Sequence, residues 1–249
     1  MASEQLAIPE FHGRYFEPFL GGGAMFFHLA PKVSFLSDAN DRLIETYQAI
    51  KDDWLSVQNL LIKMQKLHSS AYYYEERARV RQRPHTRAAQ FLYLNRTCYN
   101  GLYRVNLSGQ FNVPIGTKTQ VVLPDDNFEG ASAVLQGANL HACDFEDMML
   151  DARKGDLVFL DPPYTTAHNK NGFLKYNQKI FSWDDQVRLR RCVEAAKMRG
   201  ARIVLTNANH ESIHRLYNDI GAPRILNRSS VISGSPSARG TTTEVVYVL

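Results

Sequence analysis

The stretch Tyr15–Leu36, YFEPFLGGGAMFFHLAPKVSFL, constrains the fold more than any other part of the chain. A short aromatic run leads into three consecutive glycines, an apolar stretch with helical spacing and the β-type run Val33–Leu36. Asp38 follows, and apolar residues then recur at helical spacing over Leu43–Ile50. This order of strand, glycine turn, helix, strand, acid and helix predicts the start of a doubly wound α/β sheet.

The glycine turn and Asp38 together indicate a ligand site. Glycine allows positive φ and lets the backbone approach a bound molecule closely. Asp38 comes 17 residues after Gly21, near the spacing at which α/β folds use an acid to bind ribose hydroxyls. A plain tight turn is the alternative, but the pair favours a nucleoside-containing cofactor. Phe26 stands where a dinucleotide fingerprint has its third glycine, which disfavours a nicotinamide dehydrogenase.

Two later strands are also predicted to end in acids. Asp144–Phe145 follows the predicted strand Asn139–Ala142, where an acid and an aromatic ring can bind an amino group and stack on a base. A loop acid and a core phenylalanine are the alternative there. Val158–Tyr164 reads VFLDPPY, and its prolines stiffen the backbone around the acid. Asp161 and the Pro162 carbonyl could accept hydrogen bonds from one amino group while a tyrosine ring stacks beside it.

The α/β pattern is interrupted over residues 52–138. We expect a helix over residues 52–83 that Pro84 ends, a second helix over residues 87–99, and a β-hairpin around Leu107–Gln110. Residues 51–120 hold 11 Lys and Arg against 4 Asp and Glu, whereas the remainder holds 18 against 21. A basic insertion predicts a polyanionic partner, although a solvated helix surface is the plain alternative.

The α/β pattern resumes after the insertion. Residues 1–51 and 139–249 therefore form one predicted domain and residues 52–138 an inserted second one. The later elements expected are the strand Leu157–Leu160, the helix Trp183–Arg199, the strand Arg202–Thr206, the helix Glu211–Ile220 and the strand Thr243–Leu249.

Composition excludes several classes of protein. No apolar run approaches the roughly 18 residues of a membrane span, and the first residues lack the pattern of a signal peptide. Three unclustered cysteines suggest neither a disulfide framework nor a zinc site. We therefore expect a cytosolic protein with reduced thiols and no metal.

Taken together, several segments resemble the Dam-type, D12 class family of adenine-specific N6 DNA methyltransferases. The resemblance runs in order through EPFLGGGAMFF, LSDAN, NGLYRVNLSGQFNVPIG, CDFED and VFLDPPYTTAHNKNGFLKYNQKIFSWDDQVRL. It implies a Rossmann-like S-adenosylmethionine-dependent methyltransferase sheet with an inserted helical and β-hairpin domain that recognises DNA. Residues 1–51 and 139–249 would be catalytic, and residues 52–138 would read the target.

The resemblance also implies a role for individual residues. The catalytic set that would hold the target adenine is Asp161, Pro162, Pro163 and Tyr164. The set that would bind the cofactor is Glu17, Phe19, Gly21, Gly23, Asp38, Asp144 and Phe145. The set that would contact DNA is Arg96, Tyr99, Asn100, Leu102, Arg104, Asn106 and Pro114.

The implied reaction is transfer of a methyl group from S-adenosylmethionine to the exocyclic amine of an adenine flipped out of double-stranded DNA, with GATC as the target. The enzyme would be monomeric, without a metal, and would work beside the nucleoid in bacterial or phage-infected cytoplasm, in housekeeping or restriction–modification.

Two departures keep alternatives open. Residues 1–13 contain no Lys-Trp-x-Gly-Gly-Lys-like segment, which the family usually carries before its glycine loop. Thr117–Lys118 stand where several GATC-reading members have an aromatic residue. The alternatives are a catalytically impaired DNA-binding homologue and a methyltransferase that acts on RNA.

Overall fold

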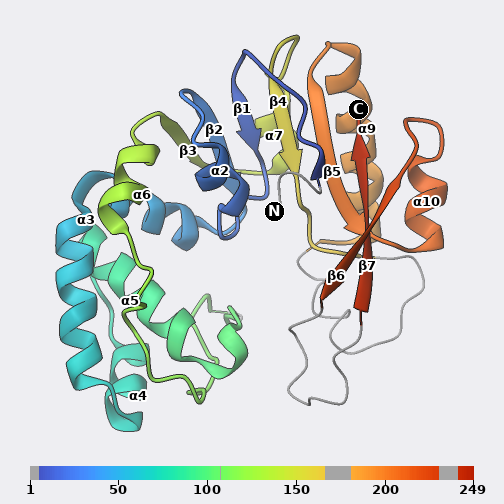
Figure 1. Ribbon diagram of the computed structural model, residues 1–249. Helices are drawn as coiled ribbons and strands as arrows, with labels where there is room; N and C mark the ends of the chain where they lie inside the picture. Colours follow the sequence, from blue (N-terminus) through green and yellow to red (C-terminus); the bar gives the residue numbers. More distant parts are fainter. Residues whose placement is uncertain (1–5, 107, 166–180, 230–240) are drawn as a thin grey trace. The chain divides into compact units, whose positions relative to one another are not determined.

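The computed structural model describes residues 6–106, 108–165, 181–229 and 241–249. The chain divides into two compact units, one formed by Met1–Ala39 and His141–Leu249 and the other by Asn40–Leu140 (Figure 1). The second unit therefore begins some residues before residue 52, because helix α3 (Asp41–Leu67) packs against α5 (Pro84–Thr97) and α6 (Phe128–Leu135). The helix is kinked at Asp53, whose φ of −152° is not helical.

The strands form a seven-stranded sheet with the order β3-β2-β1-β4-β5-β7-β6 (Figure 1). β1 pairs in parallel with β2 and β4, and β4 pairs in parallel with β5, whereas β7 runs antiparallel to β5 and β6. The predicted α/β class is confirmed. The strands are β1 (Tyr15–Glu17), β2 (Ser34–Asp38), β3 (Ala138–Ala142), β4 (Leu157–Leu160), β5 (Arg202–Ala208), β6 (Arg224–Ser229) and β7 (Thr241–Val248).

Strand β6 was not expected from the sequence. Its segment RILNRS contains two arginines and an asparagine, so its apolar alternation is weak. It pairs only with β7 within the described sheet, and Ile225 is 60% exposed there. A strand at the edge of a sheet can leave many of its side chains exposed, so it does not need a clear apolar pattern. The sequence pattern therefore does not reveal β6.

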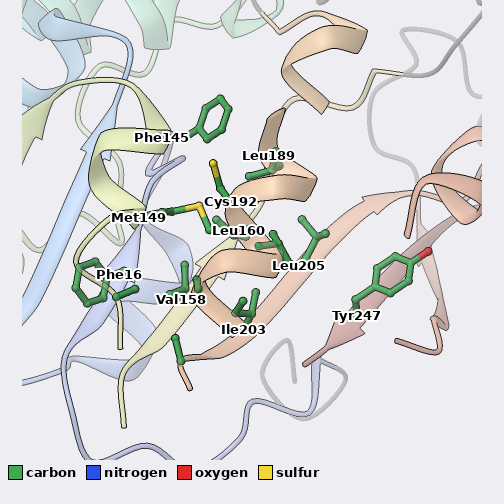
Figure 2. Packing of buried hydrophobic residues seen from close by; sticks show 14 of the residues in the cluster. Phe16, Phe145, Met149, Val158, Leu160, Leu189, Cys192, Ile203, Leu205 and Tyr247 are labelled. Atoms are coloured by element: carbon green, nitrogen blue, oxygen red, sulfur yellow. The ribbon is translucent and has the colours of Figure 1, made fainter. Parts of the chain in front are cut away.

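Alternate residues of the central strands point to one face of the sheet and are buried in a hydrophobic core. The helices that cover this face are α7 (Phe145–Met149), α9 (Trp183–Met198) and α10 (Glu211–Tyr217), which contribute to the same core. α9 begins after Ser182 because Ser182 and Asp185 form a capping box. Among the strand residues of this core, Figure 2 labels Phe16, Val158, Leu160, Ile203, Leu205 and Tyr247.

The second unit is helical. Besides α3, α5 and α6, it contains α4 (Ser70–Ala78) and the short 3-10 helix Tyr99–Gly101. The helix expected over residues 52–83 is interrupted, because Ser69 accepts a hydrogen bond from the backbone of Tyr72 and starts a new helix. Pro84 begins α5 rather than only ending a helix, since the first turn needs no donor from its nitrogen.

The predicted hairpin is a turn with isolated antiparallel bridges in place of continuous strands. The bridges join Val105 to Phe111 and Cys98 to Ile115. Asn106 closes the turn, because its backbone donates to the Gln110 carbonyl at 2.8 Å and its side-chain oxygen accepts from the Gln110 backbone at 2.9 Å. Leu107, which the sequence placed in the turn, lies outside the described residues.

The core predicts the outcome of a matched pair of substitutions. Ile203 of β5 is fully buried, so Ile203→Ala should lower the free energy of unfolding by about 2–5 kcal/mol. Ile225→Ala on the edge strand should cost about 1 kcal/mol or less. Urea denaturation followed by circular dichroism measures both values. Equal losses from the two variants would contradict the assignment of this face as the core.

Candidate active site

The glycine loop between β1 and α2 (Ala24–Leu29) is held to the end of β2. The Leu20 nitrogen donates to the Ser37 carbonyl at 2.9 Å, and the Gly21 nitrogen donates to Asp38 Oδ2 at 3.0 Å. Gly21 and Gly23 adopt φ values of 46° and 63°, which other residues rarely adopt. A Cβ atom on Gly21 would meet nothing within 4 Å. The loop is thus fixed at its base and leaves open space beside its backbone.

A cavity of about 310 Å³ lies beside this loop within the first unit. Carboxyl groups of Glu17 and Asp161 both line it, as does the hydroxyl-bearing Thr206. The strands that deliver these three residues are β1, β4 and β5, whose parallel pairing brings their carboxyl ends to one edge. The remaining lining residues are Leu6, Phe19, Leu20, Gly21, Gly22, Gly23, Ala24, Met25, Phe159, Leu226, Asn227 and Glu244.

Glu17 is a buried acid in this cavity, with only 3% of its surface exposed. Its Oε2 accepts a hydrogen bond from the Tyr15 hydroxyl at 2.8 Å, and its carboxyl also accepts one from the Phe26 backbone. The pKa of Glu17 is raised to about 8, mainly by burial and to a smaller extent by the negative charge of Asp161, while the two hydrogen bonds act against the shift. Burial likewise raises the pKa of Tyr15 well above its ordinary range.

Asp161 stands at the end of β4 with its carboxylate oriented by two hydroxyls. Thr206 donates to Asp161 Oδ1 at 2.5 Å, and Tyr164 donates to the same oxygen at 3.4 Å. Pro162 is buried, whereas Asp161 is exposed. Thr206 was not singled out from the sequence. Its position at the end of the predicted strand Arg202–Thr206, at the same edge of the sheet, is the signal that could have found it.

Asp144 and Phe145 are near the loop but do not line the cavity. Asp144 caps α7, since its side chain accepts a hydrogen bond from the Glu146 backbone at 2.9 Å. Phe145 is 5% exposed and stacks on Phe19 with ring centroids 5.3 Å apart. Arg188 contacts both of them, and its position among the arginines of α9 gave no signal in the sequence.

The predicted DNA-contacting residues lie in the second unit, and most are exposed. Tyr99 is 53% exposed, and Asn100 beside it has a φ of 54°. Arg104 is exposed and donates from Nε to the Asn112 side chain at 2.8 Å. The other members of the set are Leu102, which is half-buried, and Asn106 and Pro114, which are exposed.

Arg96 differs from the other members of this set. Its guanidinium forms a two-pronged ion pair with Asp126 at 2.6 and 2.7 Å and also donates to the Val121 carbonyl. These contacts hold the loop before α6 in place. A DNA phosphate would have to compete with Asp126 for Arg96.

Comparison with known sequences decides the class of the protein. Residues 5–231 match the family described as D12 class N6 adenine-specific DNA methyltransferase. The chain belongs to this family. It is therefore an adenine-specific DNA methyltransferase, as the resemblance of its motifs implied.

Curated relatives of this methyltransferase are themselves named methyltransferases or methylases. It is 35% identical to the type II methyltransferase M1.LlaDCHI of Lactococcus lactis subsp. cremoris, over 97% of this chain and 88% of the relative. It is 33% identical to the type II methyltransferase M.MjaIII of Methanocaldococcus jannaschii, over 86% and 80%. The DNA adenine methylase of Escherichia coli K12 is 31% identical, over 77% and 70%.

The family implies S-adenosylmethionine as the methyl donor of this methyltransferase, and the residues present fit such a ligand. The donor carries a positively charged sulfur and an ammonium group, and Glu17 and Asp161 supply carboxyl groups around the cavity. The open space beside Gly21 and Gly22 allows a ligand to approach the backbone.

The structure also bears on metals and membranes. Among the residues it describes, no group of three or more His, Cys, Asp or Glu side chains is placed to hold a metal ion. Nor does any helix in the described ranges have the length and apolar character needed to cross a membrane.

Glu17 predicts a dependence of stability on pH. Between its ordinary pKa of 4.5 and the folded value of about 8, the unfolded chain is ionised while the folded carboxyl keeps its proton. The stability contributed by Glu17 is thus fully present below about pH 4.5 and is lost as the pH rises through about 8. Glu17→Gln removes this loss, because a glutamine does not ionise. The free energy of unfolding of the variant minus that of the unsubstituted protein should therefore increase by roughly a few kcal/mol between about pH 5 and pH 8.

Urea denaturation across this pH range measures the difference. Glu211→Gln, which removes an exposed carboxyl on α10, controls for the loss of one acidic side chain. A Glu17→Gln difference that stays constant with pH would contradict the description of Glu17 as a buried proton-bearing group.

Proposed function

We propose that this methyltransferase transfers a methyl group from S-adenosylmethionine to the exocyclic amine of an adenine that is flipped out of duplex DNA, within GATC. One observation carries the proposal. The glycine loop, Glu17 and Asp161 line a single cavity, so a cofactor beside the loop and an amine at Asp161 would be neighbours. In this proposal residues 1–51 and 139–249 are catalytic, and residues 52–138 recognise the target.

The target amine needs activation, because its lone pair is delocalised into the purine ring. Asp161 and the Pro162 carbonyl would accept hydrogen bonds from that amine and favour a pyramidal nitrogen with a localised lone pair. Thr206 supports this role, since its 2.5 Å hydrogen bond fixes one carboxylate oxygen of Asp161. Pro163 stiffens the turn, and Tyr164 would stack on the adenine.

Residues of the loop and its neighbours would hold the cofactor. S-adenosylmethionine supplies a methyl group bonded to a positively charged sulfur. Asp161 would favour that charge, and so would Glu17 once the charge of the ligand stabilises its ionised form. Phe19 and the glycines would shape the cavity, and Asp38 would bind the ribose hydroxyls. Asp144 and Phe145 would bind the adenine end. Positioning and electrostatics account for the rate, without a metal or a covalent intermediate.

The hairpin of the second unit would read the DNA. An adenine inside a duplex cannot present its amine to a cofactor, so extrusion at a cost of about a few kcal/mol must precede transfer. Tyr99 and Asn100, exposed at the end of α5, would intrude at the flipped base. Arg104 would contact a base edge, as arginine does with guanine. The GATC target rests on the resemblance of NGLYRVNLSGQF to Dam-type enzymes.

We further propose a monomer that acts in bacterial or phage-infected cytoplasm. A catalytically impaired DNA-binding homologue is the second candidate. Calorimetric titration with S-adenosylmethionine distinguishes the two, because the impaired homologue would show no binding at millimolar cofactor.

A methylation assay tests the proposed reaction. Unmethylated plasmid is incubated with the protein and S-adenosylmethionine, then cut with nucleases that distinguish methylated from unmethylated GATC. We expect complete protection from the nuclease that methylation blocks. Unchanged cutting together with methyl incorporation elsewhere would refute GATC alone, whereas no incorporation would refute methyl transfer by this chain.

Asp161→Ala provides the control for the chemistry. The variant should lose methyl transfer by at least about 100-fold while it still binds the duplex, because Asp161 acts on the amine and not on the DNA backbone. Gel-shift and methyl-incorporation assays measure the two properties. Retained transfer would contradict the role of Asp161.

A further inference from the structure

Arg188, in the first half of α9, is half-exposed, yet its guanidinium contacts three acidic side chains and one aromatic ring. Its two terminal nitrogens donate to the two carboxylate oxygens of Asp144 at 3.0 and 2.8 Å. The same guanidinium reaches Asp185 at 3.0 Å and Glu146 at 3.3 Å. Its central carbon lies 4.4 Å from the centroid of the Phe145 ring. Three acids and one aromatic ring therefore hold a single cation.

The contacts to Asp144 and Phe145 reproduce those that a purine would make. A guanidinium is flat, stacks on aromatic faces and donates a pair of parallel hydrogen bonds to a carboxylate. An adenine is also flat, stacks on a phenylalanine and donates hydrogen bonds from its amino group. Arg188 thus contacts the same ring and the same acid that the cofactor's adenine would use.

The surroundings leave little room for both groups. Phe145 is 5% exposed, with Phe19 stacked at 5.3 Å and Phe181 at 5.7 Å between ring centroids. The 310 Å³ cavity extends to Phe19 but is not lined by Asp144 or Phe145. With Arg188 in this place, the cavity would accommodate the end of the cofactor beside Glu17 and Asp161, and the protein's own side chain would occupy the place of the adenine.

We infer that Arg188 competes with the adenine of the cofactor for Asp144 and Phe145, and so sets the affinity for the cofactor. The inference rests on the proposed function, since it takes S-adenosylmethionine as the ligand of this site. Binding requires the guanidinium to leave Phe145 and at least one oxygen of Asp144. Asp185 and Glu146 can retain it at the rim, because both already contact it.

Competition within the chain lowers the apparent affinity by the fraction of molecules in which the adenine site is free. Arg188 and Asp144 are 37% and 40% exposed, so solvent screens their ion pair and the contact is modest in strength. Removal of Arg188 should therefore tighten cofactor binding by about three- to tenfold.

Isothermal titration calorimetry with S-adenosylhomocysteine tests the inference without any need for turnover. Arg188→Ala should bind this product about three- to tenfold more tightly than the unsubstituted protein does. The fragment 5′-methylthioadenosine carries the adenine without the amino-acid end, and its affinity should rise by the same factor. Arg188→Lys keeps the charge but loses the flat two-pronged donor, so it should also tighten binding and serves if the alanine variant does not fold.

Arg190→Ala is the matched control. Arg190 lies two residues further along α9 and pairs with Glu194 and Asp219, away from Asp144. Its loss should leave the affinity for S-adenosylhomocysteine unchanged. Equal tightening in the Arg190 variant would overturn the inference, because it would indicate general loosening of the helix.

Three further results would overturn the inference in distinguishable ways. Weaker binding by both Arg188 variants would show that Arg188 positions Asp144 for the ligand instead of competing with it, and unchanged binding would show that Arg188 does neither. Both results would leave the proposed function intact. Failure of the unsubstituted protein and all variants to bind S-adenosylhomocysteine would overturn the proposed function and this inference together.

Discussion

Strand β4 is buried on both faces between β1 and β5, and the register of these three strands determines the geometry of the whole site. Leu160 pairs with Leu205, so the next residues along, Asp161 and Thr206, emerge side by side at the edge of the sheet. Their 2.5 Å hydrogen bond is a direct consequence. A shift of either strand by one residue would turn its buried side chains to the opposite face, and burial therefore fixes the position of the acid.

The same register brings a second acid to the edge. β1 pairs with β4 through Tyr15–Leu157 and Phe16–Val158, so Glu17, the last residue of β1, lies at the same end of the sheet. Its burial makes the negative form costly, and the charge of Asp161 adds to the cost. A positively charged ligand would offset that cost. The proposed methyl donor carries two such charges, which links the electrostatics of the cavity to the proposed chemistry.

Much of this site was predictable because its signals are local. VFLDPPY contains an apolar strand and its terminal acid within seven residues. The three consecutive glycines indicate a loop whose backbone adopts positive φ angles. The contribution of Thr206 depends on strand register, and that of Arg188 depends on how α9 packs against α7; neither is encoded near the residue concerned. Helix boundaries in the second unit were missed for a related reason, because Ser69 caps a helix within a stretch of helical composition.

The residues predicted to contact DNA show a further limit of sequence reasoning. In the sequence, nothing distinguishes Arg96 from Arg104 as a basic residue that could contact DNA. In the structure, Arg96 forms an ion pair with Asp126, whereas Arg104 is exposed on the hairpin. Only packing separates an arginine that stabilises a loop from one that is available to a partner. Net charge can suggest which unit would face a polyanion, but it does not indicate which residues would touch it.

The central claim is that the amine of a flipped adenine and the methyl donor meet in the cavity between Glu17 and Asp161. A crystal structure of the protein with S-adenosylhomocysteine and a GATC duplex tests it most directly. We expect the adenine amine within about 3 Å of an Asp161 carboxylate oxygen and of the Pro162 carbonyl, with the cofactor sulfur on the side of the glycine loop. An adenine that stays stacked in the duplex while the cofactor is bound, or a cofactor bound away from Gly21–Gly23, would contradict the account.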